Sequence, residues 1–378
     1  MSLTCINLLT CPVNRKKGVH LKPVTVLLTC TGGVISPSQI GSLRSNPEGR
    51  PLRIIGTDMT VPCAGQYLTD KFYQVPYGTD PEYVEKLADI CSKESVNVLF
   101  PASHEEALAL TRNAELFKKI GTTIAVSKPD VLELSFNKKS AFQKLKEKGL
   151  PCPEFQVVKN LGEFEDAAAE LGINKRKLVI KPVLTRGGRG ARILTKENTA
   201  HSLLNEKPGR LEAGYDEIVR TLSELEENDF PELILMEHLP GTIYSVDFLA
   251  KDGRALIIVP KVRIVGNASQ TIVGIVKRNP LVEETVARIS EAFGFDYNVN
   301  IEMGLNIEGI PLPFDFNPRI AASVAFCTAA GANLIYYALK MALGEEVPIV
   351  EVKDKTMMIR YFKELYVSDG AWFNIGPN

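Results

Sequence analysis

Three side chains that carry oxygen donors lie close together near the end of the sequence: Glu302, Asp315 and Asn317. Carboxylate and amide oxygens are the ligands that Mg²⁺ takes in proteins, with its remaining positions filled by water and phosphate. The alternative is a solvated polar surface with an ion pair, because single motifs often mislead. The choice depends on whether the three side chains share one face of one element.

A β-hairpin would bring them together. Apolar residues alternate with period two over residues 301–307 and again over 310–316, which predicts two strands that each bury one face. Glu308-Gly309 between them suits a two-residue turn, because glycine readily takes a positive φ. The two carboxylates then face each other at roughly 5 Å between Cβ atoms, and the amide shares their face. Carboxylates this close repel each other unless a proton or a cation lies between them.

Two prolines restrict how this hairpin can sit in a sheet. Pro311 and Pro313 have the same parity, so their missing N–H groups point to the same side of the second strand. That side must therefore be a free sheet edge or an irregular stretch.

The composition is that of an ordinary globular protein, with 378 residues of which 45% are hydrophobic and 24% are charged. This length predicts two or three packed units. The net charge of −1 excludes a broad basic surface for nucleic acid, and no apolar run reaches the ~20 residues of a membrane helix. The seven cysteines form no C-x-x-C pair, which argues against a zinc site and favours a reducing cytoplasm.

The first third of the chain alternates strand and helix patterns. Apolar runs at 24–30, 52–56 and 96–100 predict strands, and an S-x-x-E capping box at 103–106 begins a helix. Strands that alternate with helices form a parallel layer, which binds ligands at the carboxyl ends of its strands. The turn at residues 31–33 lacks the G-x-G-x-x-G pattern, so we predict no dinucleotide site there.

Two further segments carry charge that suits phosphate. Lys181 ends a predicted strand over 178–181, and the turn that follows at 185–190 is rich in glycine and arginine. Backbone N–H groups of such a turn can approach phosphate closely. Lys138 lies in a helix predicted over 135–149, whose N-cap is Ser135 or Asn137. Each feature alone is more often a plain turn or a surface lysine.

The order of these parts is more specific than any one of them. An α/β layer is followed by a helix with a lysine, a strand lysine before a glycine-rich hairpin, a Met-Glu pair at 236–237, and acidic strands that end in D-x-N-P-R at 315–319. This order resembles the ATP-grasp superfamily, most closely its carbamoyl-phosphate-synthetase-like carboxylate–amine ligases, over roughly residues 24–350. The resemblance implies a mixed α/β and α+β fold. An N-terminal Rossmann-like (pre-ATP-grasp) parallel sheet is followed by an ATP-grasp fold of two α+β subdomains that clamp ATP.

The resemblance also divides the chain into domains. We expect an N-terminal extension over residues 1–22, a pre-ATP-grasp Rossmann-like domain over 23–130 and an ATP-grasp domain over 131–345. The small lid subdomain of the latter spans about 151–236. Residues 346–378 are expected to form a C-terminal tail that packs on the ATP-grasp domain.

Site residues carry over from the family position by position. The metal ligands that the resemblance implies are Glu302, Asp315 and Asn317. The implied catalytic residues are Arg319 at the transferring phosphate and Lys181 at the α- and β-phosphates. Arg263, on a predicted strand near the site, is a separate candidate to hold a substrate carboxylate, and a surface arginine is the alternative. The implied cofactor-binding residues are Lys138, Lys181, Gly187, Gly188, Gly190, Met236, Glu237 and Leu239.

One position departs from the family pattern. The family places a ribose-binding glutamate where this chain has Ile243. An isoleucine side chain cannot accept a hydrogen bond from a hydroxyl, so another residue must contact the ribose. Glu237 is one option.

The implied activity is that of a ligase that uses ATP and Mg²⁺ (or Mn²⁺). A carboxylate is a poor electrophile, and its phosphorylation gives an acyl phosphate that an amine can attack, while the protein positions phosphates and spreads charge. Two alternatives stay open: an enzyme that makes carboxyphosphate or carbamoyl phosphate from bicarbonate, and an ATP-binding regulatory protein without catalysis. The expected partners are small-molecule carboxylates and amines, amino acids among them, in the cytoplasm, with neither nucleic acid nor membrane. The oligomeric state is left open, a homodimer included.

Overall fold

The computed structural model describes residues 21–184, 189–197, 211–266, 271–369 and 371–373. The expected N-terminal extension, apart from its last two residues, and the predicted phosphate contacts Gly187 and Gly188 lie outside these ranges. Within them, no helix is both long and apolar enough to cross a membrane.

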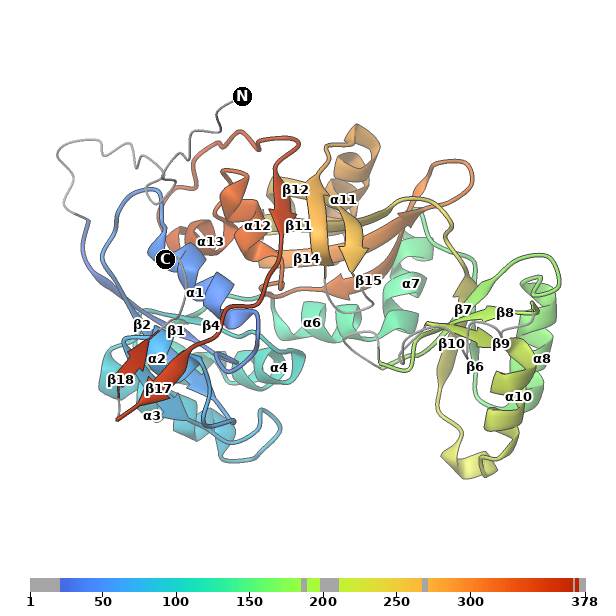
Figure 1. Cartoon of the computed structure of the whole chain (residues 1–378), viewed down its shortest axis with the longest axis horizontal. Helices are drawn as coiled ribbons and strands as arrows, with labels where there is room; N and C mark the ends of the chain where they lie inside the picture. Colours follow the sequence, from blue (N-terminus) through green and yellow to red (C-terminus); the bar gives the residue numbers. More distant parts are fainter. Residues whose placement is uncertain (1–20, 185–188, 198–210, 267–270, 370, 374–378) are drawn as a thin grey trace. The chain divides into compact units, whose positions relative to one another are not determined.

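The chain forms two compact units (Figure 1). The first contains residues up to 126, residues 319–352 and residues from 362 onward; the second contains residues 127–318 and 353–361. The domain boundaries that we expect from the family resemblance stay a prediction.

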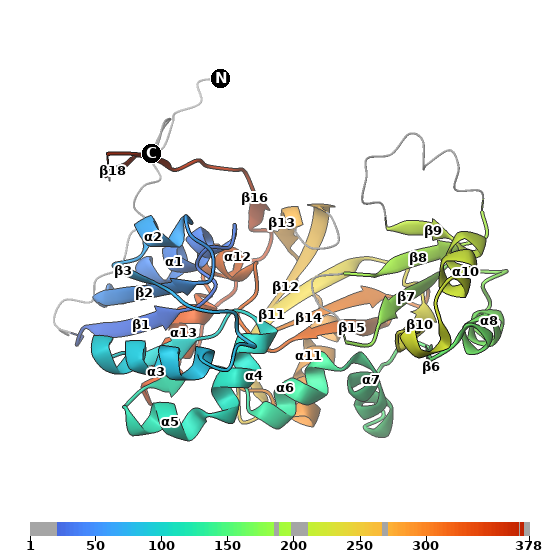
Figure 2. The same ribbon diagram turned by 90° about the horizontal axis from the view of Figure 1, so that it is seen from below.

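The first unit is built on a five-stranded parallel sheet in the order β3-β2-β1-β4-β5. Its strands are β1 (Val24–Leu28), β2 (Leu52–Asp58), β3 (Lys71–Gln74), β4 (Val98–Phe100) and β5 (Thr123–Ile124). The helices between them are α1 (Ser36–Arg44), α2 (Gly65–Leu68), α3 (Tyr83–Glu94), α4 (His104–Arg112) and α5 (Ala114–Lys119). Figure 2 shows α1 and α2 on one side of the strands and α3 and α5 on the other. The parallel layer is therefore as predicted.

The predicted capping box begins α4. Ser103 accepts a hydrogen bond from the backbone N–H of Glu106, whose carboxylate accepts one from the Ser103 N–H, which completes the predicted capping box. The unit also contains α12 (Val324–Ala329), α13 (Leu334–Ala342) and a two-stranded hairpin, β17 (Tyr366–Ser368) and β18 (Ala371–Phe373).

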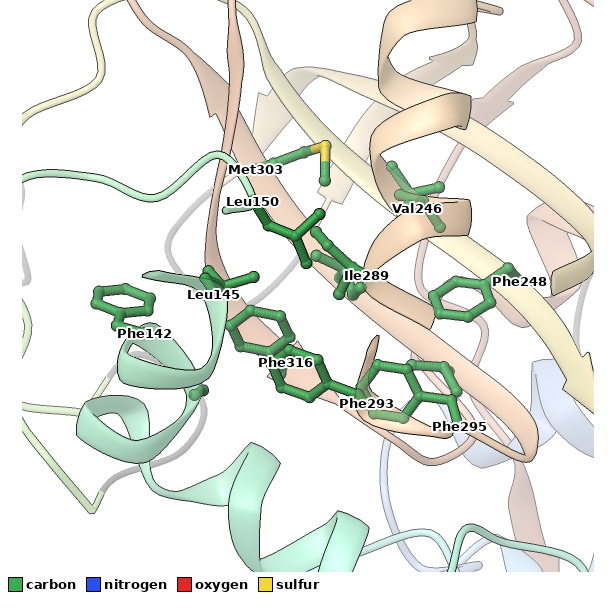
Figure 3. Packing of buried hydrophobic residues seen from close by; sticks show 14 of the residues in the cluster. Phe142, Leu145, Leu150, Val246, Phe248, Ile289, Phe293, Phe295, Met303 and Phe316 are labelled. Carbon is green, nitrogen blue, oxygen red and sulfur yellow. The ribbon is translucent and has the colours of Figure 1, made fainter. Parts of the chain in front are cut away.

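The second unit contains a six-stranded antiparallel sheet in the order β15-β14-β11-β12-β13-β16. Its strands are β11 (Ile243–Lys251), β12 (Arg254–Gly266), β13 (Thr271–Val276), β14 (Tyr297–Leu305), β15 (Pro311–Asn317) and β16 (Met357–Ile359). One face of this sheet is apolar and packs against α7 (Lys138–Glu147) and α11 (Pro280–Phe293), where Phe293 stacks on Phe316 with 5.2 Å between ring centroids (Figure 3). Period-two alternation places the polar residues of the same strands on the opposite face.

A second sheet in this unit has the order β6-β10-β7-β8-β9. It consists of β6 (Phe155–Val158), β7 (Leu178–Pro182), β8 (Arg192–Thr195), β9 (Glu212–Gly214) and β10 (Leu233–Glu237), with the helices α8 (Leu161–Glu170) and α10 (Tyr215–Ser223) and the short 3₁₀ turn η1 (Glu227–Asp229). Its core is separate, with Phe164 stacked on Tyr215 at 5.7 Å between centroids. Figure 2 shows both helices on the same side of these strands.

The helix predicted over 135–149, with its cap at Ser135 or Asn137, begins after the second of these residues. The structure has two helices, α6 (Pro129–Phe136) and α7, with extended backbone at Asn137 between them. The Asn137 side chain accepts a hydrogen bond from the N–H of Ser140 at 3.0 Å and so caps α7. Lys138 is therefore the first residue of α7, and its side chain lies at the N-terminal end of the helix.

The hairpin of β14 and β15 has the predicted register at its acidic end, but the predicted turn is wrong. Glu302 pairs with Asp315, as predicted. The strands are joined by five residues, 306–310, in which only Gly309 has a positive φ, whereas the two-residue turn with Gly second needs one at both positions. A bulge at Phe314, which has no partner in the register, offsets the longer turn and restores the predicted pairing.

The position of this hairpin in the sheet satisfies its two prolines. β15 is an edge strand of the six-stranded sheet, so the side of Pro311 and Pro313 that lacks N–H groups faces away from β14. The free edge predicted from their parity is confirmed.

Candidate functional site

The paired acidic strands bring Glu302, Asp315 and Asn317 together on the polar face of the six-stranded sheet. Glu302 and Asp315 are directly opposed, and the Asn317 side-chain amide donates a hydrogen bond to the Asp315 carboxylate at 2.8 Å. Opposed residues of an antiparallel pair point to the same face. The site thus presents two carboxylates and one amide within reach of a single ion.

Glu302 is held in a position that disfavours its charge. Burial raises the pKa of its carboxyl to about 7, the neighbouring Asp315 charge adds to the rise, and Arg263 and Lys181 oppose it. The Arg263 guanidinium lies 3.1 Å from a Glu302 carboxylate oxygen. The positive charge of Arg263 therefore does not fully offset the burial of Glu302 and the repulsion from Asp315. A further cation beside the two carboxylates would be stabilised.

Two buried lysines approach the acidic pair from other elements. The Lys138 ammonium, at the start of α7, lies 3.4 Å from Asp315, and only 5% of the residue is exposed. Lys181, on β7 and 6% exposed, donates to the Phe314 carbonyl at 2.7 Å. That carbonyl belongs to the bulged residue, which has no partner in the strand ladder.

The Lys181 ammonium is also in an unfavourable place for its charge. Burial lowers its pKa to about 7, and the nearby Lys138 lowers it further, while Asp315 and Glu302 act in the opposite direction. An anion that entered between the two lysines would relieve their repulsion, as a cation would relieve the two carboxylates. The region between the two carboxylates and the two lysines is therefore suited to a pair of opposite charges, such as a metal ion and a phosphate.

A polar network that we did not predict lies beside the acidic pair. Asp247 on β11 and Lys261 on β12 form an ion pair at 2.7 Å, with 4% and 3% of their side chains exposed. The Asn300 amide donates to Asp247 at 2.6 Å and to Ser245 at 2.9 Å. A sequence signal existed, because both charged residues interrupt otherwise apolar strands, and such residues are rarely buried unless they are paired.

The predicted adenine segment contains Met236, Glu237 and Leu239. Met236 and Leu239 are buried, and the backbone of β10 forms ladders with β6 and β7. The Glu237 carboxylate accepts a hydrogen bond from the Glu154 N–H at 2.9 Å and lies 3.6 Å from Arg176. These contacts hold Glu237 at the ends of β6 and β7, and its role toward the base or the ribose stays a prediction.

A glycine allows this segment to pack closely on β14. A Cβ atom at Gly304 would lie 2.8 Å from the Leu239 Cβ, a distance that real contacts do not show. Leu239, two residues after the end of β10, can therefore keep its position only because residue 304 has no side chain.

Two other predicted residues are described outside this cluster. Gly190 has a φ of +73°, and a Cβ there would lie 2.9 Å from the Pro182 ring at the end of β7. Arg319 begins the part of the chain that belongs to the first unit, and its guanidinium donates to the Ile320 carbonyl at 2.9 Å. The roles predicted for both toward phosphate stay predictions.

The donor set fits a hard divalent cation only with help from a ligand. In the part of the chain that the structure describes, no group of three or more His, Cys, Asp or Glu side chains could hold a metal. Glu302, Asp315 and Asn317 supply two carboxylates and an amide, which is typical of Mg²⁺ sites completed by substrate phosphates and water. The residues therefore fit Mg²⁺ in a nucleotide complex and do not form an all-protein metal cage.

Two family models match separate parts of the sequence. A model described as "ATP-grasp in the biosynthetic pathway with Ter operon" matches residues 229–365, and a "PylC-like, N-terminal domain" model matches residues 42–125. No curated protein matches the sequence.

Solved structures of similar fold cover most of the chain. The biotin carboxylase domain of Hydrogenobacter thermophilus 2-oxoglutarate carboxylase, a dimer in complex with MgADP and bicarbonate, is 18% identical, with a TM-score of 0.61 over 88% of this chain and 72% of that one. N5-carboxyaminoimidazole synthetase from Staphylococcus aureus is 14% identical, with a TM-score of 0.63 over 88% and 81%. An L-amino acid ligase from Bacillus licheniformis is 16% identical, with a TM-score of 0.57 over 85% and 74%.

At these identities the structural likeness shows the fold, while the two family models each match one part of the sequence. Both parts appear in the order predicted, with a parallel N-terminal sheet before two sheets of mixed and antiparallel strands. Residues 229–365 therefore match an ATP-grasp family, and most of the chain has the fold of these solved structures.

Proposed function

We propose that this protein is an ATP- and Mg²⁺-dependent ligase that activates a carboxylate as an acyl phosphate and joins it to an amine, with release of ADP and phosphate. One observation carries the proposal. Glu302, Asp315 and Asn317 share a sheet face, and two buried lysines from other elements approach the same place. Such a juxtaposition of acceptors and ammonium groups suits a triphosphate bound with its metal.

Each group has a distinct part in this proposal. Lys138 and Lys181 hold phosphate oxygens, and their buried positions make these contacts stronger than contacts in water. Glu302, Asp315 and Asn317 would hold Mg²⁺, which supplies charge neutralisation at the transferring phosphate. Arg263, whose guanidinium lies 3.1 Å from the Glu302 carboxylate, would orient the substrate carboxylate.

Water must be kept from an acyl phosphate, because water would hydrolyse it. Lys181 lies on β7, and the glycine-rich sequence 185–190 follows this strand in the chain; of its glycines, Gly190 is among the described residues. We propose that this turn covers the phosphates.

The test is incubation with ATP, Mg²⁺ and pools of carboxylates and amines, amino acids among them, with phosphate release and new masses as readouts. Asp315→Asn should lower the rate of ADP formation by at least about 100-fold, the scale for losing one electrostatic group at the transferring centre. Asp89→Asn, an exposed aspartate on α3, is the matched control and should leave the rate unchanged. Undiminished turnover by Asp315→Asn would refute the metal assignment.

The same assay decides between this activity and a second candidate. One structural relative, the biotin carboxylase domain, is in complex with bicarbonate, which favours chemistry on that ion. ATP hydrolysis that bicarbonate stimulates, without any amine, would support a carboxyphosphate-forming enzyme. Tight ATP binding with no ADP from any pool would instead indicate a regulatory protein.

A further inference from the structure

Exposed apolar side chains gather at one edge of the five-stranded parallel sheet. Within residues 21–126, which the structure describes throughout, there are five exposed large hydrophobic side chains. One of them, Leu116, lies on α5, and the other four lie in the loops that follow β1, β2 and β3. These four are Val34, Met59, Val61 and Tyr77, with 72%, 52%, 40% and 44% of the residue exposed. Scattered apolar residues are normal on a protein surface, but a group in one place indicates a binding site.

Hydrogen bonds join these loops into one surface. The N–H of Gly32, after β1, donates to the carboxylate of Asp58, at the end of β2, at 2.7 Å. The side-chain amide of Gln74, at the end of β3, donates to the Met59 carbonyl at 3.0 Å. The carboxyl ends of parallel strands meet at the same edge of a sheet, and open parallel sheets bind ligands there. We call the surface formed by residues 29–35, 58–64, 75–82 and 101–105 the carboxyl edge.

The carboxyl edge contains acidic residues and no basic ones. Lysine and arginine are absent from its sequence, and its four acidic residues are Asp58, Asp80, Glu82 and Glu105. The basic residues nearest the strands lie toward the other edge of the sheet, because Arg50 and Lys93 come before strands and Lys71 begins one. An anionic group such as a phosphate or a carboxylate would therefore be repelled at the carboxyl edge, and an ammonium group would be attracted.

The turn after β1 already holds an anionic group of the chain itself. In doubly wound sheets, N–H groups of the first turn and helix point at a phosphate. Here the Gly32 N–H donates to Asp58, whose other carboxylate oxygen accepts a hydrogen bond from the Thr60 N–H at 2.8 Å. The N–H groups of Thr31 and Gly33 donate to backbone carbonyls at 3.0 and 3.2 Å. The three N–H groups of residues 31–33 thus have partners within the chain, and none is left for a phosphate.

We propose that the carboxyl edge binds the amine substrate of the ligase, and that this amine carries an apolar substituent and no anionic group. The acidic side chains attract the ammonium group, and the apolar substituent contacts Val34, Met59, Val61 and Tyr77. The inference rests on the proposed function, since it names the class of amine that is joined to the carboxylate.

Four amines separate the parts of this proposal. Leucinamide has an amino group, an apolar side chain and no anionic group. Glycinamide lacks the side chain, leucine has a carboxylate in place of the amide, and phosphoethanolamine carries a phosphate. Each is added to the full chain with ATP, Mg²⁺ and a pool of carboxylates that have no amino group, and ADP formation is measured at amine concentrations below saturation. We expect ADP to form at least about 10-fold faster with leucinamide than with the other three, the scale on which an apolar contact discriminates between substrates.

Three variants locate the site. Met59→Gln keeps the length of an exposed side chain and makes its end polar, so it should fold normally and lower the preference for leucinamide over glycinamide at least about 3-fold. Leu116→Gln is the matched control: it changes the exposed large hydrophobic residue of 21–126 that lies outside the carboxyl edge, and it should leave this preference unchanged. Glu105→Gln should lower the preference for leucinamide over leucine about 3-fold, because it removes one repelling charge.

Binding is measured separately, by saturation-transfer NMR with leucinamide and glycinamide in the absence of ATP. Preferential binding of leucinamide without ADP formation from any amine would refute the ligase activity and still support the amine site. ADP formation that is as fast with glycinamide or phosphoethanolamine as with leucinamide would overturn the inference and leave the ligase activity in place. Equal binding of the two amides, or a preference that Met59→Gln does not change, would also overturn it.

Discussion

Replacement of Glu302 by Gln should stabilise the metal-free protein above neutral pH while abolishing ADP formation. In the unfolded chain the carboxyl ionises near its ordinary pKa of 4.5, whereas in the folded protein it keeps its proton to about pH 7. The folded state thus binds the additional proton between these values. Stability from this group is therefore greatest below pH 4.5, falls as the pH rises to about 7, and stays low above it.

The size of the effect follows from the same shift. A rise in pKa from 4.5 to about 7 corresponds to at most about 3 kcal/mol of unfolding free energy. The attraction to Arg263 and Lys181 is already included, because the net shift is upward despite it. With 21% of the side chain exposed to solvent, we expect a gain of about 1–3 kcal/mol for the Gln variant at pH 8 and little change at pH 5.

The assay is thermal unfolding with a chelator at pH 5 and pH 8, where each kcal/mol shifts the midpoint by about 2–4 °C in a unit of this size. Glu283→Gln is the matched control: Glu283 pairs with Arg278 as Glu302 pairs with Arg263, and its side chain is 18% exposed. It should lose stability at pH 8. MgATP should then stabilise the unmodified protein more than Glu302→Gln. A Glu302→Gln midpoint that falls at pH 8 like that of the control would refute the electrostatic argument.

Two further predictions concern the support of the site. Lys261→Met should lower the unfolding free energy by about 3–5 kcal/mol, because Asp247 loses its buried partner. In urea titrations, the double variant Lys261→Met/Asp247→Leu should recover most of this loss. A double variant as unstable as Lys261→Met would contradict this. Gly304→Ala should raise KM for ATP more than it lowers kcat, since the added Cβ would displace Leu239. The same substitution should lower the unfolding free energy by on the order of 1–3 kcal/mol. An unchanged KM in steady-state kinetics would show that this packing does not position the nucleotide.

Local patterns in the sequence were sufficient for the elements and for the acidic pair. Alternation with period two fixes which side chains share a strand face, so the pairing of Glu302 with Asp315 was predictable. The prediction of the turn failed, because a five-residue loop and a bulge at Phe314 together give the same pairing as a two-residue loop. Strand register at one end therefore does not determine the path of the chain at the other.

The order of the motifs along the chain, which resembles that of the ATP-grasp superfamily, suggested roles that no single local pattern indicates. Lys138 and Lys181 look like ordinary surface lysines by themselves, and the resemblance to the ATP-grasp superfamily singled them out. Their burial, and the pKa of about 7 that burial produces in Lys181, follow from packing of α7 and β7 against β15, elements far apart in the sequence. The spacing of residues along the sequence does not show which distant elements pack together.

The chain's own residue pattern thus specifies strands, helix caps and the face on which each polar group lies, because these depend on neighbours a few positions away. Which polar groups are buried from solvent depends on which elements pack over them. The Asp247–Lys261 pair and the approach of two lysines to two carboxylates arise only when distant elements meet and exclude water. Charges in a low-dielectric environment interact strongly with ions of opposite sign, and that environment exists only in the folded protein.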